Sequence, residues 1–219
     1  MTIILAAISY ITSLLLDFNF VSPYTTLQED LNYLASNLQN QQISIWAWLF
    51  TALITFLAIP PYILLFHGRL KVLQYINGLW LLGASAGFLL MGIAGLELYQ
   101  QLASGALAGL EETNEQEWLT LLGLYQDELF SRRVGSSFVG LFAMGLGLTR
   151  LKIKRFPFIA SLLLIISGPT MIFLNWYDPE HLARTGAMAG IIIGISIFSV
   201  RIINKGLDKK GRQEIQEDK

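Results

Sequence analysis

Two adjacent arginines, Arg132 and Arg133, stand at the start of an apolar stretch and carry the most specific chemistry in the sequence. A guanidinium group is always charged, and its planar fork of N–H donors suits carboxylate and phosphate groups. A third arginine, Arg184, stands near the start of another apolar stretch. Charged side chains beside lipid pair with a counter-ion or bind a charged ligand, so we expect one of these roles for each arginine.

Two of the three arginines have an acidic residue at helical spacing. Glu128 precedes Arg132 by four residues, and Glu180 precedes Arg184 by four. On a helix this spacing places the side chains side by side, in the order that favours an ion pair. The simplest interpretation is that each arginine pairs with its own glutamate and steadies a helix end near the lipid headgroups.

Arg133 has no such local partner, because the residue four positions before it is Leu129. Glu97, which closes another apolar stretch, is a candidate counter-ion, and an anionic ligand is the alternative. Glycine-rich helix starts could bring Arg133 and Arg184 together. The sequence therefore predicts an outer pocket for ligand binding, made by Arg132, Arg133, Arg184, Glu97, Glu128, Glu180 and His181.

His181 has metal-compatible neighbours in Asp178 and Glu180, but the spacing matches no known zinc-ligand pattern. Acidic residues are also favoured in the first turn of a helix by the helix dipole, without any metal. The chain has no cysteine, which excludes disulfides, thiolate nucleophiles and Cys-ligated metals. Without cysteines, the sequence does not indicate the redox compartment of the protein. We expect no metal site, no catalytic residue and no cofactor.

The composition is that of a membrane protein. Of 219 residues, 53% are hydrophobic and only 14% are charged, whereas soluble domains have about 25% charged residues. The formal net charge of −1 offers no basic surface for phosphates, so we expect no nucleic-acid partner. Membrane lipids are the expected surroundings of most of the chain.

Apolar stretches of suitable length predict an all-α integral membrane protein, a single-domain bundle of six transmembrane helices. Two short amphipathic surface helices are expected in the outward loops. They are indicated by capping-box patterns at Thr26 and Thr113, each followed by an apolar face. The predicted spans cover about residues 2–21, 43–66, 72–96, 134–148, 156–176 and 182–203, and residues 204–219 form a charged cytoplasmic tail.

Glycines and prolines mark special points within the predicted spans. The glycines of span 72–96, such as Gly87, leave room for a neighbouring backbone, and the Pro60–Pro61 pair and Pro169 interrupt two spans. Glycine recurs every four residues in the last span, a pattern typical of close helix packing in lipid. Contact with other membrane subunits or with a second copy is therefore predicted through Gly186, Gly190 and Gly194.

The basic residues predict the orientation of the spans. Twelve of the fifteen Lys and Arg residues fall in the segments 67–71, 150–155 and 201–219. The positive-inside rule places these segments in the cytoplasm, and with them both termini. Twelve of the sixteen acidic residues lie in the remaining loops, which face outward. We expect a multi-pass protein of a cytoplasmic (inner or single) membrane.

Three functions fit these features. We expect a non-enzymatic structural, sensory or accessory component of the membrane. The alternative is a carrier or binding protein for a small anionic or amphipathic solute that enters from the extracytoplasmic side, with Arg133 and Arg184 as anion contacts. A lipid-modifying enzyme is the third class, and its acid–base groups would be Glu97, Glu128 and His181.

Overall fold

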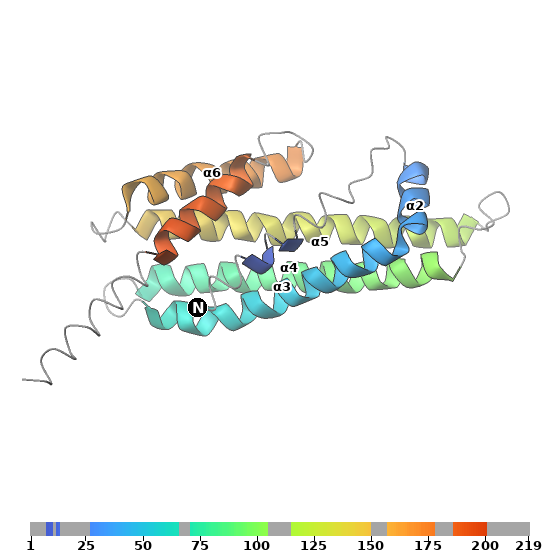
Figure 1. Cartoon of the computed structure of the whole chain (residues 1–219), viewed down its shortest axis with the longest axis horizontal. Coiled ribbons are helices and arrows are strands. Elements are labelled where there is room, and N and C mark those ends of the chain that lie inside the picture. The colour runs from blue at the N-terminus through green and yellow to red at the C-terminus, as the bar shows by residue number, and fades with distance from the viewer. Residues whose placement is uncertain are drawn as a thin grey trace, which may run out of the picture.

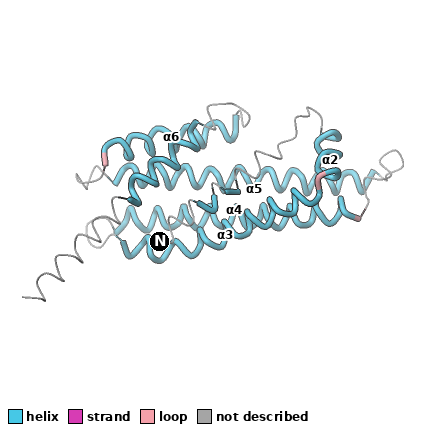
Figure 2. Tube along the Cα trace, viewed as in Figure 1, coloured by secondary structure: helices cyan, strands magenta, loops and turns pink. Residues whose placement is uncertain are grey.

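The computed structural model describes residues 8–10, 12–13, 27–65, 71–104, 115–149, 157–177 and 186–200. These residues are almost entirely helical, with no strand among them, which confirms the predicted all-α fold (Figures 1 and 2). The helices are α2 (Leu27–Ser36), α3 (Leu38–Leu65), α4 (Lys71–Ala103), α5 (Glu115–Leu148), α6 (Phe158–Tyr177) and the shorter helix Gly186–Val200. Most of the predicted first span and the whole tail 204–219 lie outside the described residues.

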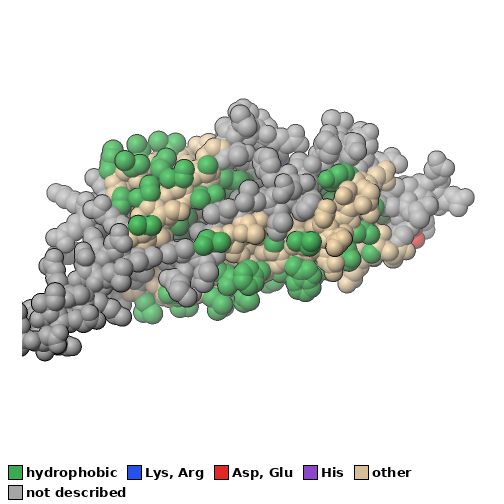
Figure 3. Space-filling model, viewed as in Figure 1, with side chains coloured by type: hydrophobic (Ala, Val, Ile, Leu, Met, Phe, Trp, Pro, Cys, Tyr) green, Lys and Arg blue, Asp and Glu red, His purple; other side chains and the backbone are tan. Residues whose placement is uncertain are grey.

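Three of the described helices, α3, α4 and α6, are long and apolar enough to cross a membrane. Large hydrophobic side chains project from them away from the protein interior, as Figure 3 shows over α6 and α3. Examples are Trp46, Phe50, Leu90, Ile159 and Ile166. A contiguous apolar exterior of this kind is unfavourable in water and favourable in lipid, which supports association with a membrane.

Helix α5 lies between α4 and α6 and forms the centre of the bundle (Figure 1). From Ser131 to Leu148 none of its residues is exposed. A helix shielded by its neighbours does not need lipid-compatible side chains on every face. This position explains why the predicted span 134–148 is short and rich in glycine and serine.

A short helix is present where the first of the two surface helices was expected, whereas the second was wrong as a separate element. Helix α2 is a short helix, and a turn at Asn37 separates it from α3. The second was expected after the capping box at Thr113, with an apolar face from Trp118 to Leu129, but these residues are the first part of α5, which continues unbroken to Leu148. No proline interrupts α5, and the change from polar to apolar composition near Val134 does not by itself end a helix.

The C-terminal end of α4 and the N-terminal end of α5 join α2 in a second hydrophobic cluster, here called the helical cap. Its centre consists of Leu31, Leu98, Leu102 and Leu121, each at most 4% exposed. Half-buried side chains surround them, among them Leu34, Trp118 and Tyr125. This packing gives the polar ends of the long helices an apolar face to bury, so that α4 and α5 extend beyond the apolar stretches.

Glycines bring the helix backbones into direct contact at two crossings, as predicted for Gly87. A Cβ added to Gly87 of α4 would lie 2.6 Å from the Cα of Gly135 of α5. At the crossing of α5 with α6, a Cβ on Gly140 would lie 2.7 Å from the carbonyl oxygen of Gly168. Small residues allow this close approach, which maximises van der Waals contact between helices.

The glycines of the last helix are used partly within the chain. Gly190 lies against Ser167 and Gly194 against Leu164, both on α6, whereas a Cβ added to Gly186 would meet no described atom within 4 Å. Contact with a second copy through Gly186, Gly190 and Gly194 therefore stays a prediction. Of the three glycines, Gly186 has free space beside it among the described residues.

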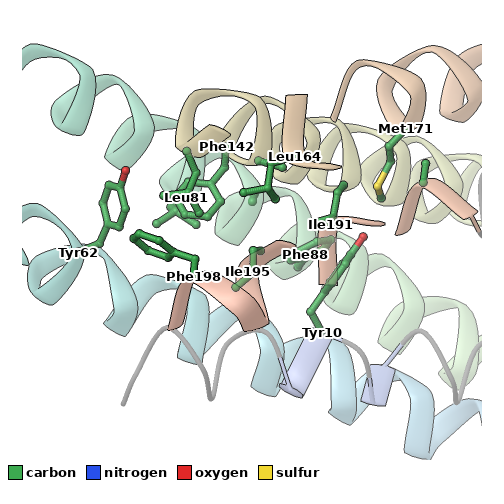
Figure 4. Close-up of a cluster of buried hydrophobic side chains, with 14 of the residues drawn as sticks. Tyr10, Tyr62, Leu81, Phe88, Phe142, Leu164, Met171, Ile191, Ile195 and Phe198 are labelled. Atoms are coloured by element: carbon green, nitrogen blue, oxygen red, sulfur yellow. The ribbon is translucent and has the colours of Figure 1, made fainter. Parts of the chain in front are cut away.

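The main core lies in the middle of the bundle and is rich in aromatic rings (Figure 4). The ring of Phe88 lies 4.9 Å from that of Trp48 and 5.5 Å from that of Tyr10, measured between centroids. Tyr62 meets Phe142 edge to face at 5.3 Å. The rings therefore tie the N-terminal helical residues, α3, α4 and α5 together.

Candidate functional site

The candidate site begins on α5, where the shielded part of the helix meets the helical cap. Glu128 and Arg132 lie one turn apart there, and Arg133 follows directly. The close contact between Gly87 and Gly135 fixes this part of α5 against α4, because neither backbone can move closer. The site is therefore held by the same contact that holds the two helices together.

Glu128 and Arg132 form the ion pair that their spacing predicts. Arg132 Nη2 donates to Glu128 Oε1 at 3.2 Å, and the side chains are 26% and 13% exposed, respectively. The carboxyl carbon of Glu128 lies 3.8 Å from the position that a Cβ on Gly95 of α4 would occupy. The absence of a side chain at Gly95 thus leaves room for the carboxylate between the helices. Partial burial makes this pair stronger than a solvated surface pair.

Arg133 and Glu97 do not pair. Arg133 is half-buried on α5 and Glu97 is exposed on α4, and no ion pair joins them in the described part of the chain. Glu97 is therefore not the counter-ion of Arg133 in this structure. Successive residues on a helix point about 100° apart, so Arg133 also turns away from the direction that Arg132 takes to reach Glu128.

Three members of the predicted outer pocket, Glu180, His181 and Arg184, lie outside the described residues. The pairing of Glu180 with Arg184 and the convergence of Arg133 and Arg184 therefore stay predictions. Among the residues that the structure does describe, no three His, Asp or Glu side chains lie close enough together to hold a metal ion.

Buried amides are the polar groups that the sequence reasoning missed. Asn175 of α6 is fully buried, and neither its Oδ1 nor its Nδ2 has a hydrogen-bond partner among the described residues. Ser136 of α5 is also fully buried, and its Oγ has no partner there either. A single asparagine within an apolar span was the available signal, because polar residues in lipid-crossing helices are costly and often functional.

The two unpartnered groups belong to neighbouring helices, Ser136 to α5 and Asn175 to α6. Helices α5 and α6 run antiparallel, with Gly140 against Gly168 and with Trp176 Nε1 donating to Ser137 Oγ at 3.0 Å. This register places Ser136 and Asn175 near the level of Arg133. A buried polar group without a partner costs free energy, so a bound water or polar ligand at either group would be stabilising.

Further buried hydrogen bonds connect the helices deeper in the bundle. Asn77 Nδ2 donates to the hydroxyl of Tyr62 at 2.7 Å, and Ser85 Oγ donates to the carbonyl oxygen of Ala52 at 2.8 Å. Both bonds join α3 to α4. Because hydrogen bonds are directional, they fix the relative orientation of α3 and α4 more specifically than apolar contacts do.

A search with this chain finds no matching family model, no matching curated protein and no matching solved structure.

Proposed function

We propose that this chain is a multi-pass protein of a cytoplasmic (inner or single) membrane that acts, without enzymatic activity, as a structural, sensory or accessory component. The distribution of Lys and Arg supports six crossings with both termini in the cytoplasm. In this topology the helical cap faces the extracytoplasmic side, and its role is to present a fixed surface to a partner there.

The continuity of α4 and α5 from the bundle into the helical cap is the observation that carries this proposal. The helices have 33 and 34 residues, so each is about 50 Å long. A bilayer has a hydrocarbon core of about 30 Å, and about 20 Å of each helix therefore extends beyond it. Because the helices are unbroken and packed together, a displacement of the cap is transmitted to the spans, as a sensory or accessory role requires.

Photo-cross-linking in cells tests this role with two positions that are equally exposed. Leu119 in the cap and Leu90 in the α4 span are each 57% exposed. A photoreactive amino acid at position 119 is expected to give a protein adduct of defined mass, and one at position 90 is expected to give lipid adducts only.

The cap itself provides the control for this experiment. Leu98→Asp places a carboxylate in the fully buried centre of the cap, so it should abolish the adduct at position 119 and leave the lipid adducts at position 90. A cap position that gives no protein adduct in cells, or an adduct that survives Leu98→Asp, would refute a docking role for the cap.

The second candidate function is a carrier or binding protein for a small anionic or amphipathic solute. Asn175 of α6 and Ser136 of α5 favour it, because both have buried polar atoms that lack a partner among the described residues, near the level of Arg133. Thermal stability is measured for the wild type and an Arg133→Ala, Arg184→Ala double variant against a panel of anions. The carrier hypothesis requires a stabilising anion whose effect is lost in the double variant, and equal responses remove it.

A further inference from the structure

Helices α5 and α6 meet at a glycine contact that determines which of their side chains face each other. A Cβ added to Gly168 of α6 would lie 2.5 Å from the carbonyl oxygen of Gly140 of α5. Nearer the C-terminal end of α6, Trp176 Nε1 donates to Ser137 Oγ, so the helices are still in contact there. Because the two helices run antiparallel, residues after Gly168 lie at the level of residues before Gly140.

Three polar side chains lie on these facing surfaces. Asn175 is seven residues after Gly168, and Arg133 is seven residues before Gly140. Seven residues are close to two turns of an α-helix, so each side chain lies on the same face as its glycine. Ser136, four residues before Gly140, lies on nearly the same face of α5. Helical spacing therefore places the three side chains between α5 and α6, within about one turn of one another.

None of these three side chains has a partner among the residues that the structure describes. Asn175 and Ser136 are fully buried, and Asn175 Oδ1, Asn175 Nδ2 and Ser136 Oγ all lack a hydrogen bond there. Arg133 is half-buried, and no hydrogen bond or ion pair joins it to a described side chain. Each unpartnered polar group costs free energy when it is buried, and a half-buried guanidinium group favours a bound anion. A ligand that satisfies all three groups would therefore stabilise this interface.

Two aromatic rings mark the side from which such a ligand would enter. Phe130 of α5 and Trp176 of α6 meet edge to face, with their ring centroids 5.8 Å apart. Their side chains are 57% and 43% exposed, respectively. Phe130 precedes Arg133 by three residues, so the ring pair lies about one helical turn from the arginine. Because tryptophan prefers the boundary between headgroups and acyl chains, the entrance would lie at that boundary in the proposed membrane location.

The donors and acceptors of the three side chains select the chemistry of the ligand. Arg133, Ser136 Oγ and Asn175 Nδ2 can all donate, so together they require an anion with several acceptor oxygens. Asn175 Oδ1 only accepts, so the ligand must also carry a donor. A carboxylate, sulfate at neutral pH and a phosphodiester group only accept. Hydrogen phosphate and a phosphate monoester carry both acceptor oxygens and an O–H donor.

We propose that Arg133, Ser136 and Asn175 bind a protonated phosphate group, which belongs either to a free phosphate compound or to the headgroup of phosphatidic acid. Arg133, Ser136 Oγ and Asn175 Nδ2 donate to the phosphate oxygens, and the P–OH group donates to Asn175 Oδ1. The site rests on the second candidate function proposed above, for which it names the ligand class.

Calorimetric titration of the full chain in a neutral detergent tests the ligand class with two pairs of probes. Inorganic phosphate is compared with sulfate, and phosphatidic acid is compared with phosphatidylglycerol of the same acyl chains. In one pair the first probe is expected to bind about tenfold more tightly, because its competitor's anionic group leaves Asn175 Oδ1 unpaired. The pair that shows the preference identifies the source of the phosphate group.

The two ways in which this titration can fail have different meanings. Equal affinities within both pairs would overturn the phosphate site but leave an anion-binding function standing. If none of the four probes binds, the second candidate function is refuted together with the site.

Two buried serines provide a matched pair of variants. Ser136→Ala should weaken binding of the preferred probe about tenfold, because one hydrogen bond to a charged group is lost. Ser161→Ala is the control, since Ser161 is also buried without a partner among the described residues but lies near the opposite end of α6. It should leave the affinity unchanged. An equal loss in both variants, or in neither, would overturn the site.

Asn175→Leu separates ligand binding from a structural role. Leucine has a similar size and no polar atom, so without ligand the variant should unfold at a temperature at least as high as the wild type. It should nevertheless lose the preference between the two probes of the selective pair. A variant that keeps this preference would overturn the site. A large loss of thermal stability without ligand would also overturn it, because it would show that Asn175 has a structural partner.

Discussion

Gly87 of α4 and Gly135 of α5 lie backbone to backbone, since a Cβ on Gly87 would lie 2.6 Å from both the Cα and the N of Gly135. Neither atom belongs to a flexible side chain that could move aside. The helices would have to separate to admit even one methyl group, and this separation would disturb the neighbouring Glu128–Arg132 pair as well.

Gly87→Ala is therefore expected to lower the free energy of unfolding by about 1–3 kcal/mol, the usual cost of overpacking. Gly123→Ala on α5 is the control, because nothing described lies within 4 Å of its added Cβ. It should be neutral or stabilising by up to about 1 kcal/mol, since alanine favours a helix more than glycine does. Thermal unfolding in detergent, followed by circular dichroism, measures both; equal shifts would contradict the backbone contact.

The Glu128–Arg132 pair is expected to contribute to stability because it is partly buried. Glu128→Ala should cost about 1–3 kcal/mol by leaving the guanidinium group without its carboxylate. Asp127→Ala, at an exposed neighbouring position, should change stability by less than about 0.5 kcal/mol. A double-mutant cycle with Arg132→Ala isolates the coupling, and a coupling energy near zero would show that each side chain finds its main partner elsewhere.

Removal of the Tyr62 hydroxyl tests the buried link between α3 and α4. Tyr62→Phe should lower the free energy of unfolding by about 1 kcal/mol, because Asn77 Nδ2 loses its acceptor and Asn77 Oδ1 already has no partner among the described residues. Tyr177→Phe is the matched control at a side chain that is 77% exposed. An equal effect of the two substitutions in thermal unfolding would argue against the hydrogen bond.

The topology can be tested with single cysteines, because the chain has none of its own. Cysteines at Gln39, Thr113 and Asp178 should react with an impermeant maleimide from outside the cell. Cysteines at Gly68, Lys152 and Gly211 should react only after permeabilisation, because the proposed topology places the basic turns and the tail in the cytoplasm. Labelling of Thr113 and Lys152 from the same side would rule out the proposed crossings.

The sequence predicts local features of this fold well. Helix α2 follows from a capping box and leucines at helical spacing, and the Glu128–Arg132 pair follows from i,i+4 spacing alone. The close approach of α4 and α5 at Gly87 likewise follows from the lack of a side chain on glycine. Each of these features depends on a few residues that are close together in the sequence.

Features that depend on distant parts of the chain could not be predicted in this way. Residues 116–129 form part of α5 because α4 and α2 supply an apolar partner in the cap, and hydropathy along one segment carries no information about such a partner. Whether Arg133 meets Glu97 depends on the rotation of α5 about its axis. Whether Asn175 finds a partner depends on the residues that pack against α6, so the lack of one among the described residues cannot be predicted from any pattern within α6.

The shielded position of α5 has a consequence for biogenesis. A segment of about fifteen apolar residues that starts with two arginines partitions poorly into a bilayer by itself. Helix α4 precedes α5 in the chain and contains Gly87, against which Gly135 of α5 packs. In the proposed membrane location, α5 should therefore leave the translocation machinery alongside α4 rather than alone. A substitution that blocks the close approach at Gly87 would then impair insertion before it impairs the finished protein.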